Sequence, residues 1–282
     1  MDAQGARSVL VTGCSSGIGE AAARTLAARG WQVVASCRKQ ADCDRLANEG
    51  FACTLIDYQD PDSIARGYAV ALEHTGGRLD ALINNGAYAI PGAVEDLPVD
   101  ALRAIFETNL FGWHALTRKA LATMRGQGDG GRIVNVSSVL GLQAMTYRGA
   151  YVATKFALEG LSDTLRLELR GTPIRVVTVQ PGPIATRFRI NARPHFYKWI
   201  DWRNSPNRRL YEDRLMPRLD DETGSQPFEL GPDAVANKLV RALEARDPRP
   251  HYYVTVPTYA LAFLRRALPT RWLDAVAAKA SG

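Results

Sequence analysis

Short, almost uninterrupted apolar runs alternate with longer segments of helical periodicity over the first two thirds of the chain. The apolar runs predict strands at Ser8–Thr12, Trp31–Cys37, Ala52–Ile56, Leu79–Ile83, Arg132–Val136 and Ile174–Gln180. The helical patterns lie at Gly17–Arg29, Pro61–Thr75, Val99–Met124 and Ala150–Arg170. Continuous apolar strands are typical of a parallel sheet covered on both faces. We therefore expect an α/β fold, with a single doubly wound parallel sheet of about seven strands and helices on both faces.

The last third of the chain has a different pattern. Residues 184–230 mix Pro, Arg, Asn and aromatic residues with weak periodicity, and such a segment is often a lid or binding loop. Regular patterns then return, with a helix at Pro232–Ala245, a last strand at Tyr252–Val256 and one or two amphipathic helices between Tyr259 and Ala280, broken at Pro269. We interpret residues 1–282 as one domain: a core (8–183), a lid (184–230) and a C-terminal part (231–282).

Glycines follow the first strand in the order that a phosphate-binding turn needs. The segment Thr12-Gly13-Cys14-Ser15-Ser16-Gly17-Ile18-Gly19 leads directly into the first helix. Glycine permits the tight turn and the close approach of backbone to a pyrophosphate, and the helix N-terminus attracts the negative charge. This context predicts a Rossmann-type dinucleotide site in the core. We expect Thr12, Gly13, Ser15, Ser16, Gly17, Ile18 and Gly19 to bind the cofactor.

The end of the second strand indicates which dinucleotide binds. An acidic residue there would accept hydrogen bonds from the adenosine ribose and repel a 2′-phosphate. The sequence instead has Cys37, followed by Arg38 and Lys39. Arginine holds phosphate through paired, charge-assisted bonds, so NADP(H) is favoured over NAD(H). The alternative is that the two cations are a solvated pair at the start of a helix.

Four polar residues stand where a reacting group would meet such a cofactor. Tyr151 and Lys155 are four residues apart in a predicted helix and share one face, Ser138 follows the fifth strand, and Asn109 lies within the long helix. Taken singly, each has an ordinary structural interpretation, such as a surface pair or a locally capped side chain.

Taken together, these residues resemble the short-chain dehydrogenase/reductase family from residue 8 to about residue 190. The matching pieces are Thr12–Gly19, Asn84–Ala87, Asn109, Ser138, the Tyr151-Val152-Ala153-Thr154-Lys155 segment and Pro181-Gly182. One difference is the order Gly86-Ala87, where the family usually has alanine and then glycine. The difference predicts a shifted backbone beside the adenosine ribose without loss of binding.

The resemblance implies a role for each residue. Tyr151 would exchange a proton with the substrate oxygen, Ser138 would hydrogen-bond that oxygen, and Lys155 would bind the nicotinamide ribose and lower the pKa of Tyr151. Asn109 would hold a water that links Lys155 to solvent. Thr186 would contact the carboxamide and Asp57 the adenine. The remaining cofactor-binding residues implied in this way are Asn85, Gly86, Ala87, Pro181, Gly182 and Ile184, besides Asn109, Tyr151 and Lys155 themselves.

The substrate is expected to be a small lipophilic carbonyl compound or alcohol. The chain resembles bacterial NADP-dependent aldehyde reductases, a subgroup near the retinol and 17β-hydroxysteroid dehydrogenases of the same family, and this resemblance implies an apolar aldehyde or ketone. Apolar residues near the catalytic motif agree, and we expect substrate contacts from Ser138, Leu140, Met145, Tyr147 and Phe188. Alternatively, the aromatic residues among them, and those of the lid, are ordinary core or subunit-contact residues. An NAD(H)-linked alcohol, hydroxysteroid or retinol dehydrogenase is the second candidate, and a non-catalytic nucleotide-binding module is a third.

Composition and charge limit the binding partners, metals and cellular location that we expect for this chain. The net charge of +6 comes from scattered arginines without a basic stripe, so nucleic acid is not an expected partner. Four cysteines lack metal-ligand or disulfide spacing, so we expect no metal, and free thiols indicate a reducing compartment. The sequence shows neither a signal peptide nor an apolar stretch long enough to span a membrane. We therefore predict a cytoplasmic protein.

The amphipathic C-terminal segment has three possible roles. It could lie on a membrane surface, cap the active site or join a subunit contact, and we favour the last two. The resemblance also implies a homodimer or homotetramer that pairs the helices predicted at 99–124 and 150–170.

Overall fold

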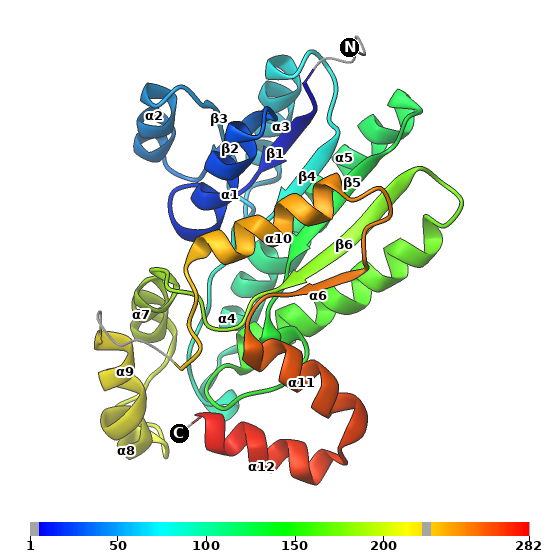
Figure 1. The fold of residues 1–282 in the computed structure, drawn as a ribbon. Coiled ribbons are helices and arrows are strands. Elements are labelled where there is room, and N and C mark those ends of the chain that lie inside the picture. Colours follow the sequence, from blue (N-terminus) through cyan, green and yellow to red (C-terminus); the bar gives the residue numbers. More distant parts are fainter. Residues whose placement is uncertain (1–5, 222–226, 282) are drawn as a thin grey trace.

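A computed structural model describes residues 6–221 and 227–281, so residues 222–226 of the expected lid, and residues 1–5 and 282 of the expected domain, lie outside the described residues. Within the described part, the strands form one seven-stranded parallel sheet in the order β3-β2-β1-β4-β5-β6-β7 (Figure 1). The strands are β1 (Ser8–Val11), β2 (Gln32–Cys37), β3 (Ala52–Leu55), β4 (Ala81–Asn84), β5 (Gly131–Val136), β6 (Ile174–Gln180) and β7 (His251–Tyr253). The prediction of a doubly wound parallel sheet is confirmed.

Helices cover both faces of the sheet. One face packs against α1 (Gly17–Ala28), α2 (Gln40–Asn48) and α10 (Pro232–Glu244), and the other against α3 (Pro61–His74), α5 (Gly112–Gln127) and α6 (Gly149–Glu168). Successive residues of β1 alternate between the two cores: Val9 and Val11 belong to the first, and Leu10 to the second. Because both faces are covered, every position of β1 is apolar or buried, which explains its uninterrupted hydrophobic run.

The strand order reverses direction at β1. From β1 the chain winds outward to β3, and from β4 it winds to β7 on the other side. In parallel α/β sheets, the crevice at such a reversal, beyond the carboxyl ends of the strands, is where ligands bind. Here that crevice lies between the ends of β1 and β4.

The predicted lid is helical, which corrects the expectation of an irregular loop. It contains α7 (Phe188–Trp199), α8 (Arg208–Leu210), a π-helical turn (Tyr211–Leu215) and α9 (Met216–Asp220). These short helices bury a cluster of their own, made of Phe196, Ile200, Tyr211, Leu215 and Leu219. Frequent arginines and Pro194 inside α7 obscure the helical period in the sequence.

Two further local predictions were wrong. The sequence predicted no element between Cys37 and Ala52, where α2 forms; it is nine residues long and buries only Cys43 and Leu46, so its periodic signal is weak. The last strand was placed at Tyr252–Val256 but ends at Tyr253, and Val256 begins α11 (Val256–Ala267). Proline in the first turn of α11 favours a helix there and disfavours a strand.

The remaining elements agree with the sequence pattern. The long helix consists of α4 (Val99–Phe106), a π-helical turn (Glu107–Phe111) and α5, and the C-terminal break at Pro269 separates α11 from α12 (Thr270–Ser281). Short 3₁₀ turns lie at Val94–Asp96 and Val139–Gly141. Within the described residues, no helix combines the length and the apolar character needed to cross a bilayer.

Candidate active site

The loop after β1 forms a tight glycine-rich turn at the start of α1, where the sequence predicts phosphate binding. Gly13 and Gly17 have φ of +68° and +63°, a conformation that glycine adopts without strain. Ser16 precedes α1 but does not cap it with its side chain, so the first-turn N–H groups remain available to a ligand. A Cβ on Gly19 would lie 2.2 Å from the carbonyl oxygen of Gly13, which shows how closely the helix packs on the loop.

The loop after β4 forms the opposite wall. Asn85 donates from its side chain to the Thr12 carbonyl at 3.0 Å, and its backbone N–H donates to the Thr12 hydroxyl at 2.8 Å. A Cβ on Gly13 would lie 2.6 Å from the Cα of Gly86. The inverted Gly86-Ala87 order therefore places the smaller residue where the two loops touch. The two loops thus pack closely at the point where the strand order reverses, which is where parallel α/β sheets bind a dinucleotide.

The end of β2 carries unpaired positive charge. Arg38 and Lys39 are exposed, and within residues 6–221 and 227–281 neither has a carboxylate partner. Cys37, before them, is buried. Lys39 is also the residue that precedes the first turn of α2, so both predicted interpretations of the pair fit this geometry. Asp57, predicted to meet the adenine, follows β3 and accepts a hydrogen bond from the Gln59 N–H at 3.0 Å.

Tyr151 and Lys155 lie on one buried face of α6 and are 8% and 1% exposed. The Lys155 ammonium nitrogen lies 5.5 Å from the centre of the Tyr151 ring and donates to the Val136 carbonyl at 2.8 Å. It also stands 4.4 Å from the centre of the Trp113 ring. Burial lowers the pKa of Lys155 to about 7, and Glu159 opposes that shift. The face of Trp113 favours the charged form as well.

The same burial acts on Tyr151 in the opposite sense. It raises the pKa of the phenol, and a hydrogen bond with Ser138 partly opposes the shift. Ser138 also caps the turn Val139–Gly141, because its hydroxyl oxygen accepts from the Leu140 N–H at 3.1 Å. The phenol and the Ser138 hydroxyl therefore lie close together. Lowering the pKa of Tyr151 requires positive charge beyond what the protein alone supplies there.

Asn109 lies in the π-helical turn and is fully buried. Its side-chain nitrogen donates to the Tyr88 carbonyl at 2.8 Å, and its side-chain oxygen accepts from the Tyr88 N–H at 3.1 Å. The nitrogen also reaches the Thr154 hydroxyl at 3.3 Å. Because the amide joins α6 to the loop after β4, the water-binding role predicted for Asn109 would have to come from its main chain.

The lid meets the catalytic residues through Phe188, whose ring centre lies 5.3 Å from that of Tyr151. Leu140 and Met145 pack in the apolar cluster that contains Tyr151. Tyr147 differs: its ring packs edge-on against Tyr211 of the lid, with ring centres 6.3 Å apart. Of the four predicted apolar residues, Phe188 therefore meets the Tyr151 ring, and Leu140 and Met145 share its apolar cluster. Tyr147 instead joins the lid to the core.

The segment after β6 completes the crevice. The Pro181 carbonyl accepts from the Val139 N–H at 2.7 Å, which fixes the segment beside Ser138. A Cβ on Gly182 would lie 2.0 Å from the Thr255 hydroxyl, so only glycine fits. Ile184 bridges to Leu230, and Thr186 lies where a Cβ on Gly17 would meet its methyl group at 3.1 Å. Of the predicted cofactor residues in this segment, Thr186 therefore lies beside the phosphate turn.

Sequence reasoning missed several supporting residues. Trp113 lies under Lys155 and donates to the Gly86 carbonyl at 2.8 Å; its position one turn after Asn109 was an available signal. Glu159, one turn after Lys155, is buried and accepts from the Gln180 side chain at 3.1 Å. Lid residue His195 stacks on Tyr88 with ring centres 4.2 Å apart. No local pattern indicates that contact, because Tyr88 and His195 are 107 positions apart in the sequence and meet only in the folded chain.

Comparisons with known proteins agree with this geometry. A family described as short chain dehydrogenase matches residues 7–195. The chain is 37% identical over 270 residues to the uncharacterized oxidoreductase YbbO of Escherichia coli (strain K12), covering 96% of this chain and 93% of that protein. It is 36% identical to human retinol dehydrogenase 8 over 192 residues, 64% of this chain and 60% of that one. A short-chain dehydrogenase from Streptomyces avermitilis has a similar structure, with a TM-score of 0.78, 29% identity and 98% of both chains covered.

Proposed function

This chain belongs to the short-chain dehydrogenase family and is an oxidoreductase, and from that premise we propose that it reduces an apolar aldehyde or ketone with NADPH, or catalyses the reverse reaction. The observation that carries the proposal is the meeting of Tyr151, Ser138 and Lys155 in a buried site beside a glycine-lined crevice. A buried phenol next to a hydroxyl and a lysine is suited to proton exchange with a carbonyl oxygen.

The chain's own residues divide the work of the reaction. The cofactor, when bound, supplies or accepts the hydride. Tyr151 donates a proton to the substrate oxygen, and Ser138 stabilises the negative charge that develops there. Lys155 would bind the nicotinamide ribose, and its ammonium group, together with the positive charge of an oxidised nicotinamide, would favour the phenolate and so lower the pKa of Tyr151. Asn109 holds α6 and the loop after β4 in register, and its main chain offers a place for a water beside Lys155.

We propose NADP(H) as the preferred cofactor because Arg38 and Lys39 are exposed and unpaired by carboxylates within the described residues. Replacing Arg38 with alanine is expected to raise the Kd for NADPH by about 10- to 100-fold, the equivalent of one lost charge-assisted bond, with little change for NADH. Fluorescence titration with each cofactor measures both. Arg66→Ala removes an exposed arginine of α3 that pairs with Asp60 and serves as the control. An equal loss of affinity for NADPH and NADH in the Arg38→Ala variant would contradict the assignment of Arg38 to the 2′-phosphate.

We propose a lipophilic substrate because Phe188 packs against the Tyr151 ring, and Leu140 and Met145 belong to the same apolar cluster as that ring. In a series of linear aldehydes with NADPH, kcat/KM is expected to rise about 4-fold for each buried methylene. Phe188→Ala is expected to flatten that dependence. Tyr197→Ala, an exposed aromatic of the same helix, should leave it unchanged. Faster turnover of short polar ketones than of long aldehydes would contradict the proposal of a lipophilic substrate.

The second candidate is an NAD(H)-linked retinol-type dehydrogenase, which the similarity to human retinol dehydrogenase 8 favours. Initial rates with retinal and NADH, measured beside the aldehyde series, separate the two.

We also propose a homodimer or homotetramer formed through α5 and α6. The support is that Phe111, beside α5, and Phe156, Leu161 and Leu167 of α6 are exposed, and exposed apolar patches of this kind are typical of interfaces. The favoured roles of α11 and α12 remain capping the site or joining a subunit contact.

We propose a cytoplasmic location, and the four free cysteines, which are typical of a reducing compartment, support it.

A further inference from the structure

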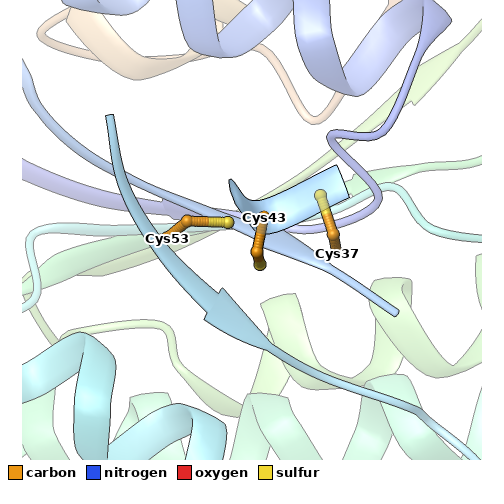
Figure 2. A group of neighbouring side chains, drawn as sticks. All are labelled: Cys37, Cys43 and Cys53. Carbon is orange, nitrogen blue, oxygen red and sulfur yellow. The ribbon is translucent and has the colours of Figure 1, made fainter. Parts of the chain in front are cut away.

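Three of the four cysteines meet although they come from three separate elements (Figure 2). Cys37 ends β2, Cys43 lies in α2, and Cys53 lies in β3. Their sulfur atoms all lie within 4.8 Å of one another. Cys37 and Cys43 are 1% and 4% exposed, whereas Cys53 is partly exposed and gives solvent a route to the group.

Sheet register and helix packing bring the three sulfurs together. Cys53 pairs with Ala35 across β2 and β3, and Cys37 lies two residues beyond Ala35, so both cysteines face the same side of the sheet. The helix α2 covers that side, and Cys43 joins the same apolar core. The Cys43 sulfur also donates to the Thr54 carbonyl at 3.3 Å. The group is therefore held by the framework of the fold.

Three thiols without other ligands suit a soft cation. Among the described residues, no histidine or carboxylate joins this group. Thiolates select Cu(I) and similar thiophilic ions, whereas structural zinc generally takes four protein ligands. Metal–sulfur bonds of about 2.3 Å need sulfurs about 4 Å apart in a trigonal arrangement. The three sulfur atoms, which lie within 4.8 Å of one another, would therefore need only small side-chain movements to bind one ion.

A disulfide between the two strand cysteines fits less well. Neighbouring strands are about 4.8 Å apart, and an offset of two residues adds about 6.6 Å along the strand, which places the Cα atoms roughly 8 Å apart. A disulfide spans at most about 7 Å between Cα atoms. Cys37 and Cys53 are thus better placed to share an ion than to bond to each other.

We propose that Cys37, Cys43 and Cys53 form a three-thiolate site for a thiophilic cation such as Cu(I), and that filling it weakens binding of the NADP(H) 2′-phosphate. Each ligating thiol releases its proton to solvent. A monovalent ion on three thiolates has a net charge of −2 where the thiols were neutral. Arg38 follows Cys37 directly in sequence, so this negative charge arises close to the backbone of the residue assigned to the phosphate. The second statement rests on the proposed preference for NADP(H).

Metal binding is tested first, without any cofactor. Reduced, metal-free protein is titrated anaerobically with Cu(I) in competition with bicinchoninate, and separately with Cd(II) to record thiolate-to-cadmium absorption. One ion per chain is expected. Cys37→Ala, Cys43→Ala and Cys53→Ala should each lower affinity at least about 10-fold. Cys14→Ala is the matched control, because Cys14 is buried but outside the group.

A folding defect in a buried variant is separated from loss of a ligand in two ways. Thermal unfolding without metal shows whether each variant is folded, and Cys53 is the least buried of the three. The absorption of the Cd(II) complex in the unaltered protein counts the ligating thiolates independently of any variant. Absence of binding, or an equal loss in Cys14→Ala, would overturn the site.

The effect on the cofactor is measured next, with Cd(II) as the redox-inert ion. Loading is expected to raise the Kd for NADPH at least about 5-fold, because charge of the same sign repels the 2′-phosphate, and to leave NADH nearly unchanged. The Cys53→Ala variant should lose this effect. If Cd(II) binds and the Kd for NADPH stays constant, the coupling is wrong while the site stands. A protein that prefers NADH would contradict the cofactor proposal without altering the metal titration.

Discussion

Replacing Tyr151 with phenylalanine is expected to lower kcat by about 10²- to 10⁴-fold, the usual contribution of a positioned general acid. The phenol is buried beside Ser138, and the lysine next to it has its amine directed at the Val136 carbonyl. No second proton donor of comparable position is evident among the described residues. Stopped-flow or steady-state NADPH oxidation with an aldehyde substrate measures the loss, and NADPH titration should show a Kd close to that of the unaltered protein.

Tyr68→Phe is the matched control for that variant. Tyr68 is also largely buried, but its hydroxyl donates to Thr123 at 2.8 Å on the α3–α5 side of the sheet. Turnover should therefore be unaffected. A Tyr151→Phe enzyme that retains more than about a tenth of the original kcat would show that another group protonates the substrate.

A single methyl group on Gly19 is expected to disable the cofactor site. The added Cβ would lie 2.2 Å from the Gly13 carbonyl oxygen and 2.7 Å from the Asn85 side-chain nitrogen, so α1 and the phosphate turn must separate. Overpacking of this kind costs about 1–3 kcal/mol of stability. Because the helix N-terminus and the turn bind the pyrophosphate together, Gly19→Ala should raise the Kd for NADPH more than about 10-fold.

Fluorescence titration and urea unfolding distinguish the two effects of Gly19→Ala. The comparison variant is Gly160→Ala in α6, where an added Cβ meets no atom within 4 Å. That change should leave NADPH binding intact and stabilise the helix by about 0.5–1 kcal/mol. Wild-type cofactor affinity in Gly19→Ala would mean that the dinucleotide lies away from this turn.

The sequence predicted the sheet well because its signal is local. The central strands, such as β1 and β4, are buried on both faces, so their hydrophobic runs can be recognised without knowledge of neighbouring elements. The phosphate turn was equally easy to predict from the sequence, because Gly13, Gly17 and Gly19 stand where the backbone closely approaches another part of the chain. The four-residue spacing placed Tyr151 and Lys155 on one helix face, and their order with Ser138 and Asn109 in the family pattern singled them out. In each case the information lies within one element or at one junction.

The lid was less predictable because its stability comes from contacts among short helices. Phe196, Tyr211 and Leu219 lie far enough apart in sequence that no single window shows their common face. The same holds for α2, whose two buried residues are too few to mark a helix. Tertiary packing supplies what local periodicity lacks in such segments.

By itself, the sequence determined the α/β class; it predicted the phosphate turn and, through the family resemblance, the set of Ser138, Tyr151 and Lys155. Only the tertiary structure decided what surrounds them: Trp113 beneath the lysine, Phe188 against the phenol and the meeting of Cys37 with Cys43 and Cys53. The physical reason is separation along the chain. Spacing within a helix or turn fixes near neighbours, whereas burial, pKa shifts and thiol contacts depend on which faces the sheet brings together.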